Sequence, residues 1–206
     1  MSDPVEPTPP VVTLWEEYGC GAEQIGPALA EALGVRWVGQ SLSSHELETA
    51  EREADEQPFE NLIDLYAVVG DNPLAPIGGE AVINERYANI ADVTAEAAEG
   101  AVILGRNATV ILAGRPNTVH VKLVGPKEQR IARAAEAAGI SVARAKHRQV
   151  REDRVRADFA LRMHSWDPHR YTGYDLTLDV TEHTAADCVD RIIAALRGGA
   201  ATDKTR

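Results

Sequence analysis

The sequence predicts an α/β fold with a mostly parallel sheet, because three short apolar runs are separated by segments of helical character. The runs are VVTLW at 11–15, AVILG at 101–105 and TVHVKLVG at 118–125. Their β-branched residues and continuous apolar character are typical of strands buried on both faces, as in parallel sheets. When strands alternate with helices, the helices cover the sheet and build a layered domain.

The chain begins with a tail and the first strand. Residues 1–10 contain four prolines and are expected to be disordered. After the first strand comes the glycine-containing turn EEYGCGAEQIG at 16–26. Apolar residues at helical spacing then indicate a helix that ends at Gly34, a suitable C-terminal cap. VRWV at 35–38 predicts a short second strand.

Helices are predicted for most of the middle of the chain. Residues 43–57 start with a serine that suits an N-cap and continue as a polar surface helix. Residues 59–70 predict another helix, and the prolines and glycines of 71–79 indicate a loop. A long helix over 80–99 leads to the strand at 101–105, after which Arg106 opens a short helix.

The last third repeats the alternation of helix and strand. Pro126 opens a helix that continues to about 138, and a second, strongly basic helix spans 141–164. YDLTLDV at 174–180 predicts the last strand, and 184–196 the last amphipathic helix. We therefore expect a single domain over 11–198, followed by a flexible tail at 199–206.

Composition excludes several classes of protein. No run of about 18 uncharged apolar residues is present to span a membrane. A net charge of -11 argues against a general nucleic-acid binder, which needs many lysines and arginines. The acidic start lacks the pattern of a secretory signal, and two cysteines are too few for a disulfide framework. These features predict a cytoplasmic protein.

Five motifs in order resemble the cytidylate kinase-like family, a branch of the nucleoside monophosphate kinases. They are YGCGAEQIG, AVILGRNATVIL, VHVKLVGPKEQRIAR, REDRVRADF and YDLTLDV, and they extend over most of the chain. The resemblance implies a three-layer P-loop kinase fold. It also implies a helical acceptor-binding region at about 43–95 and a lid helix at about 141–164.

The same resemblance implies which residues form the site. The loop that holds the phosphates of ATP would be Gly19, Cys20, Gly21, Ala22 and Glu23. Arg106 would contact the acceptor, a nucleoside monophosphate such as CMP. The lid arginines would be Arg151, Arg154 and Arg156, and Asp153 with Arg156 matches an Asp-x-x-Arg pattern of the lid. Mg²⁺ would bridge the donor phosphates, with no metal site built by the protein alone.

The loop departs from the family pattern in its charge. A Walker sequence has Gly, four residues and Gly-Lys-Ser/Thr, and here Glu16, Ala22 and Glu23 align with the first glycine, the lysine and the hydroxyl residue. Members of the family often carry arginine near the lysine position and a basic residue before the tyrosine. A carboxylate about 4 Å from a phosphate costs about 4 kcal/mol at an effective dielectric near 20, so the loop is expected to repel ATP unless its glutamates point away or bind a cation.

Other interpretations of these residues stay open from the sequence alone. Cys20 is either a reactive thiol at a helix start or a small residue in a tight loop. Arg106 is alternatively an ordinary turn residue, and Arg115 a weaker ligand candidate. The basic helix is alternatively a solvated face or a contact for RNA or an acidic partner.

Two functions are therefore predicted. The first is ATP-dependent phosphorylation of a nucleoside monophosphate, weakened by the loop. The second is a catalytically silent kinase-fold module that binds a ligand or protein partner, with a homodimer among the options.

Overall fold

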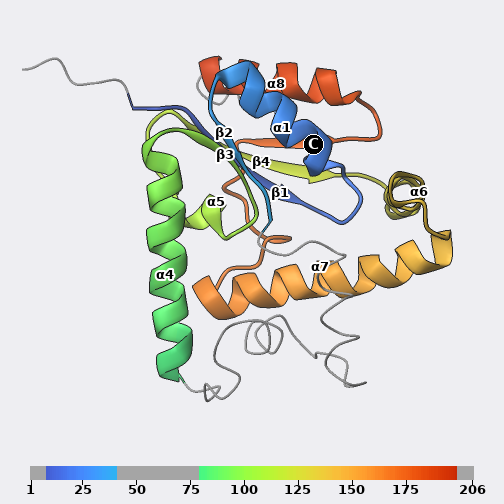
Figure 1. Cartoon of the computed structure of the whole chain (residues 1–206), viewed down its shortest axis with the longest axis horizontal. Helices are drawn as coiled ribbons and strands as arrows, with labels where there is room; N and C mark the ends of the chain where they lie inside the picture. The colour runs from blue at the N-terminus through green and yellow to red at the C-terminus, as the bar shows by residue number, and fades with distance from the viewer. Residues whose placement is uncertain (1–7, 41–78, 199–206) are drawn as a thin grey trace, which may run out of the picture.

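One fully parallel five-stranded sheet forms the centre of the protein. The computed structural model describes residues 8–40 and 79–198. The strand order is β2-β3-β1-β4-β5 (Figure 1). The strands are β1 (Val11–Glu16), β2 (Arg36–Val38), β3 (Ala101–Leu104), β4 (Thr118–Val124) and β5 (Leu176–Asp179). The predicted α/β fold is confirmed, and each predicted strand is present with ends shifted by one or two residues.

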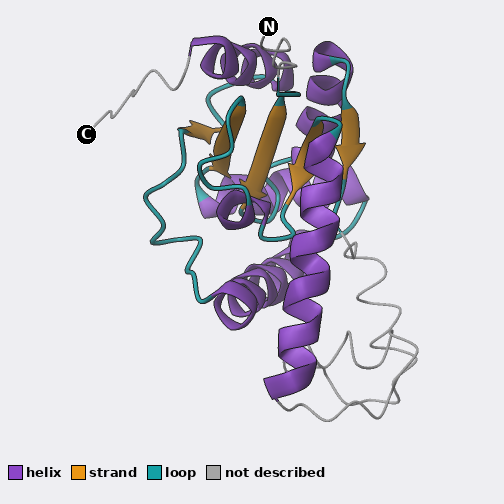
Figure 2. Ribbon diagram, turned by 90° about the vertical axis from the view of Figure 1, so that its left-hand side faces the viewer, coloured by secondary structure: helices purple, strands orange, loops and turns teal. Residues whose placement is uncertain are grey.

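Helices cover both faces of this sheet and complete three layers. They are α1 (Ala22–Leu33), α4 (Gly79–Ala98), α5 (Ala108–Ile111), α6 (Lys127–Ala138), α7 (Val142–His164) and α8 (Ala185–Gly198). Helices α1 and α8 lie together on one face, and α4, α5 and α7 lie on the other, as Figures 1 and 2 show. Helix α6 lies at the side, next to the end of α7 that it precedes. The predicted helices at 43–57 and 59–70 and the loop over most of 71–79 lie outside the described residues.

The side chains of β1 alternate between the two faces of the sheet. Val12 and Leu14 belong to the core beneath α1 and α8, whereas Val11 and Trp15 pack on the opposite face. Alternation with a period of two is the geometry of any strand. The next residue on the α1 face is Glu16, so the strand itself directs this carboxylate toward the start of α1.

The strand order also shows where ligands of sheets of this kind usually bind. The chain leaves β1 for β2 on one side, and β4 lies on the other side of β1. Ligands of open α/β sheets bind where the order reverses in this way, beyond the carboxyl ends of the strands. Here that point is the loop from β1 to α1, which is the predicted phosphate loop. No helix in the described part of the chain is long and apolar enough to cross a membrane.

Candidate functional site

The loop between β1 and α1 is a tight turn that depends on two glycines. Gly19 and Gly21 have φ of 84° and 82°, in the left-handed region that favours glycine. A Cβ on Gly19 would lie 2.3 Å from the carbonyl oxygen of Arg130, so only glycine allows α6 to approach the loop this closely. Gly21 is the N-cap of α1. The predicted phosphate loop thus has the expected strand–turn–helix setting.

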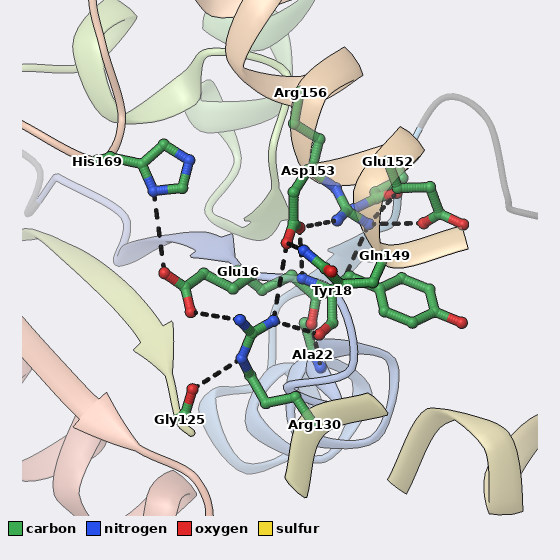
Figure 3. Close-up of polar contacts among 12 residues, drawn as sticks. Glu16, Tyr18, Ala22, Gly125, Arg130, Gln149, Glu152, Asp153, Arg156 and His169 are labelled. Atoms are coloured by element: carbon green, nitrogen blue, oxygen red, sulfur yellow. Dashed lines mark hydrogen bonds and ion pairs between the residues drawn. The ribbon is translucent and has the colours of Figure 1, made fainter. Parts of the chain in front are cut away.

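Glu16 points into this loop. Its Oε2 accepts a hydrogen bond from the backbone N–H of Ala22 at 3.0 Å, and its Oε1 lies 3.9 Å from Nη2 of Arg156 (Figure 3). Ala22 is the first residue of α1, and the start of a helix is where backbone amides bind anions. A carboxylate of the protein therefore lies where such a loop would hold a phosphate oxygen.

Burial changes the acidity of this carboxylate. Glu16 is 7% exposed, and its burial raises the pKa of its carboxyl group above the ordinary value. Arg156 and the Ala22 N–H act in the opposite direction, and the nearby Glu23 and Glu152 raise the pKa further. The carboxylate is thus held by two favourable contacts inside a site that contains other negative charges.

The remaining loop residues differ in their surroundings. Ala22 is fully buried at the position of the Walker lysine, whereas Glu23 is exposed and lines the cavity beside the loop. Cys20 is also fully buried, and burial raises the pKa of its thiol. A thiol held in its neutral form is a poor nucleophile, so the structure favours the interpretation of Cys20 as a small packing residue.

Asp153 connects helix α7 to the loop through a hydrogen bond. Its Oδ1 accepts a hydrogen bond from the backbone N–H of Tyr18 at 2.8 Å, and Oδ2 accepts one from Gln149 at 2.8 Å. Arg156, one turn along α7, contacts Asp153 at 3.3 Å and Glu152 at 3.2 Å. The Asp-x-x-Arg pair is therefore directed at the loop, and Asp153 bonds to its backbone.

Arg130 of α6 contacts both the loop and Asp153 of α7. Its Nη1 donates to the carbonyl oxygen of Tyr18 at 2.6 Å, and its Nε donates to that of Gly125 at 2.8 Å. Nη2 pairs with Glu17 at 3.0 Å, and Nη1 lies 3.8 Å from Asp153 (Figure 3). We call Asp153, Arg130 and Glu17 the clasp, because together they bind α6, α7 and the loop to one another.

A cavity of about 530 Å³ lies over the loop. Its described lining combines loop glycines, the end of the β2 segment, small residues of α6 and six charged side chains. The charged residues are Glu16, Glu23, Arg133, Arg148, Glu152 and Arg156. The size suits a small organic ligand, and the charges of the wall are balanced in number between acids and arginines.

The predicted arginines occupy different places. Arg156 lines the cavity, whereas Arg151 lies in a smaller surface pocket with Arg144, and Arg154 is 71% exposed and pairs with Asp158 at 3.5 Å. Arg106 lies in the turn after β3, and its Nε donates to the carbonyl oxygen of Gly39 at 3.0 Å. Of the three predicted lid arginines, the structure thus brings Arg156 to the loop and leaves Arg151 and Arg154 outside the lining of the cavity. Their predicted roles stay predictions.

Sequence reasoning missed the arginines of α6. Arg130 belongs to the clasp, and Arg133 reaches the loop, where its Nη1 donates to the carbonyl oxygen of Cys20 at 3.4 Å. The signal was the spacing of three in KEQRIARAA, which places both on one side of α6. Arg115, a weaker ligand candidate, instead bonds to backbone carbonyls of Pro9 and Ala97.

Residues suited to a protein-built metal centre are not grouped in the described part of the chain. No cluster of three or more His, Cys, Asp or Glu side chains lies there in a geometry that would hold an ion. Glu23 alone presents exposed carboxylate oxygens, the ligand type that Mg²⁺ prefers, where a Walker loop has its hydroxyl ligand. Among the described residues, Glu23 is thus a single carboxylate suited to an Mg²⁺ ion that nucleotide phosphates would bring.

A comparison with protein families identifies the chain. The model of the cytidylate kinase-like family matches residues 11–182. The chain belongs to the cytidylate kinase-like family. The matched range begins with β1 and extends past β5, so it includes the loop, the clasp and helix α7 of this cytidylate kinase-like protein.

Relatives of this cytidylate kinase-like chain agree on the fold. An uncharacterized protein from Eubacterium ventriosum ATCC 27560 is 20% identical, with a TM-score of 0.61 over 92% of this chain and 98% of that one. A gluconokinase from Sinorhizobium meliloti 1021 is 15% identical, with a TM-score of 0.52 over 94% of each chain. These likenesses show a kinase fold.

A curated relative is similar over a shorter stretch. A protein named uronate isomerase from Corynebacterium glutamicum is 31% identical over 105 residues, which are 51% of this chain. The match spans only 20% of that protein's length.

Proposed function

We propose that the protein is a nucleotide-binding kinase-like protein that phosphorylates a nucleoside monophosphate such as CMP from ATP only slowly, because Glu16 occupies its phosphate loop. The observation that carries the proposal is the 3.0 Å hydrogen bond from the N–H of Ala22 to the Glu16 carboxylate. Family membership and the position of the loop at the switch point of the sheet support nucleotide binding.

The residues suited to phosphoryl transfer act by position and charge. Transfer of a phosphoryl group needs little covalent chemistry from a protein, and arginines stabilise the charge on its oxygens. In our proposal Gly19, Cys20, Gly21, Ala22 and Glu23 hold the donor phosphates. Arg156 lies beside them in the cavity, and Arg106 serves the acceptor. Mg²⁺ bound to ATP would neutralise part of the phosphate charge.

The acids of the site oppose this chemistry. A phosphate on the loop must displace Glu16 from the Ala22 N–H and lie near Glu23 and Glu152. Repulsion between a carboxylate and a phosphate about 4 Å apart is about 4 kcal/mol at an effective dielectric near 20, and a helix start returns at most about 2 kcal/mol. Weak ATP binding and slow turnover follow from this balance.

The competing function is a catalytically silent kinase-fold module. The clasp favours this function, because the polar groups of the loop and of α7 already bond to each other and to α6 without a ligand. The first function predicts slow turnover by the wild type and the second predicts none, so a low wild-type rate separates them poorly. They differ in what happens when the Glu16 charge is removed, because only a nucleotide site gains affinity from that change.

The decisive experiment compares Glu16→Gln with the wild type. Gln keeps an oxygen for the Ala22 N–H and removes the negative charge, so we expect ATP affinity to rise at least about tenfold. Calorimetry with ATP and Mg²⁺ and a coupled assay across nucleoside monophosphates provide the measurements. Glu31→Gln, an exposed acid on the same helix, is the matched control and should leave both unchanged.

The outcomes separate the alternatives. Wild-type turnover above about 1 per second, the lower end of ordinary kinases, would contradict the slow enzyme. No heat with any nucleotide for either protein would leave the silent module. Equal ATP affinity of wild type and Glu16→Gln would mean that Glu16 does not compete with the donor.

A further inference from the structure

Three consecutive residues after β3 adopt left-handed backbone. Gly105, Arg106 and Asn107 have φ of 68°, 54° and 57°. Glycine adopts this region freely and asparagine tolerates it, but for Arg106 it costs about 1–2 kcal/mol. Strain of this kind persists only where the surroundings enforce it, and it is enriched at binding sites. The turn lies at the carboxyl end of β3, the strand next to β1, on the edge of the sheet where ligands bind.

Asn89 of α4 holds this turn from one side. Its Nδ2 donates to the carbonyl oxygen of Arg106 at 3.1 Å, and its Oδ1 lies 3.5 Å from Nδ2 of Asn107. Trp166, after α7, holds it from the other side, because its indole Nε1 donates to Oδ1 of Asn107 at 2.9 Å. Asn107 and Trp166 are buried, at 5% and 9% exposed. Helix α4 and the segment after α7, which are far apart in sequence, thus hold one strained turn.

His164 fixes the orientation of the Asn89 amide. Its Nε2 lies 2.9 Å from Oδ1 of Asn89. Burial lowers the pKa of His164, and the charge of Arg86 lowers it further, so the ring is neutral near pH 7. A neutral imidazole with its proton on Nε2 donates to Oδ1, which leaves Nδ2 of Asn89 facing the Arg106 carbonyl.

The held turn directs the Arg106 side chain toward the end of the β2 segment. Its Nε donates to the carbonyl oxygen of Gly39 at 3.0 Å, and Gly39 also lines the cavity over the loop. Within the described part of the chain, its two terminal Nη groups make no hydrogen bond or ion pair. A guanidinium anchored at Nε presents a preformed pair of donors, which suits two oxygens of a phosphate group.

We infer that Asn89 is a positioning residue that holds Arg106 ready to bind the phosphate monoester of the acceptor. This inference rests on the proposed function for its ligand. The Asn89 side-chain amide is then the part of α4 that contributes to acceptor recognition. The same amide connects the strained turn to His164, at the end of α7.

The test compares variants of Asn89 with a variant at an exposed position of the same helix, α4. Asn89→Ala removes the contacts with Arg106, Asn107 and His164. Asn89→Asp keeps the shape and the acceptor for His164 but loses the donor to Arg106. For both variants we expect CMP affinity to fall at least about tenfold and ATP affinity to stay within about twofold, since one charge-assisted contact is worth about 1.5–3 kcal/mol and about 1.4 kcal/mol is tenfold. Asn84→Ala, an exposed asparagine of α4, is the matched control and should bind CMP as the wild type does.

A second readout does not depend on nucleotide binding. In NMR spectra, the Arg106 Nε–H should exchange slowly with water in the wild type and Asn84→Ala, and faster in Asn89→Ala. Unchanged exchange together with unchanged CMP affinity in folded Asn89→Ala would overturn the inference. Absence of CMP binding by the wild type would overturn the proposed function and the ligand assigned here, whereas the exchange rates would still decide whether Asn89 positions Arg106.

Discussion

At the scale of single residues, His120 is a buried histidine with a defined hydrogen-bond chain. Its Nδ1 lies 2.8 Å from Oγ1 of Thr13, which in turn lies 3.2 Å from Oγ1 of Thr109. Burial lowers the pKa of His120, and the Asp175 carboxylate raises it by a smaller amount. The folded protein therefore holds this ring in its neutral form.

This leads to a prediction on the pH dependence of stability. In the unfolded chain His120 titrates near its ordinary pKa of about 6.5, so below that pH the unfolded state binds more protons than the folded state. The free energy of unfolding should therefore fall as the pH drops below about 6.5. Urea unfolding at about pH 7.5 and 5.5 should show a smaller loss for His120→Gln than for the wild type. Identical losses would contradict the assignment, and the exposed His147→Gln is the control.

Glu16 shows which features of a single site residue can be predicted from the sequence. The sequence predicted that this acid belongs to the loop, at the position of the first Walker glycine. Its direction toward α1 follows from the alternation of β1 in the structure. Its actual partner could not be predicted, because Arg156 is 140 residues away in sequence and reaches Glu16 only through the packing of α7. Whether an acid points into a loop depends on such distant charges.

At the scale of elements, apolar runs predicted β1, β3 and β4 well, because these central strands are largely buried in a parallel sheet. The edge strands β2 and β5 are more exposed. Helix α7 was also predicted closely, since Ser141 caps it and accepts a hydrogen bond from the N–H of Arg144 at 3.2 Å. The left-handed turn at Arg106 was not predicted; Arg106 was expected to open a short helix, but α5 begins at Ala108. Gly105 and Asn107 are residue types that favour this backbone, whereas arginine does not. Contacts from Asn89 and Trp166 impose the rest.

The clasp leads to a prediction about stability, because it joins α6, α7 and the loop. The Arg130 side chain is 6% exposed and bonds to two backbone carbonyls and to Glu17. Arg130→Ala leaves these buried partners unsatisfied, and removal of one member of a buried ion pair costs about 3–5 kcal/mol. Urea unfolding should show a loss of this order. Arg154→Ala, which removes a mostly exposed arginine, should lose less than about 1 kcal/mol. A loss below about 1 kcal/mol for Arg130→Ala would show that the clasp is not needed for the fold.

At the scale of the whole molecule, the carboxyl ends and the amino ends of the strands have different roles. The loop, the strained turn and the cavity lie at the carboxyl ends of the strands. Arg115 lies at the amino ends, where its Nη1 donates to the carbonyl oxygen of Pro9 at 2.9 Å and to Oγ1 of Thr118 at 3.1 Å, and its Nη2 donates to the carbonyl oxygen of Ala97 at 2.8 Å. One guanidinium thus joins the segment before β1, the end of α4 and the start of β4.

The separation predicts that Arg115 affects stability without affecting the site. Hydrogen bonds that involve a charged group contribute about 1.5–3 kcal/mol each, so Arg115→Ala should lower the free energy of unfolding by about 2–4 kcal/mol. Arg115→Lys should lose most of this amount, because an ammonium cannot reach three partners with the geometry of a planar guanidinium. Urea unfolding measures both, with Arg36→Ala as a control on the same edge, where a partly exposed pair with Glu96 is lost. Calorimetry with CMP at a temperature where each variant is folded should give the wild-type affinity, and a tenfold change for Arg115→Ala would show that the two edges are coupled.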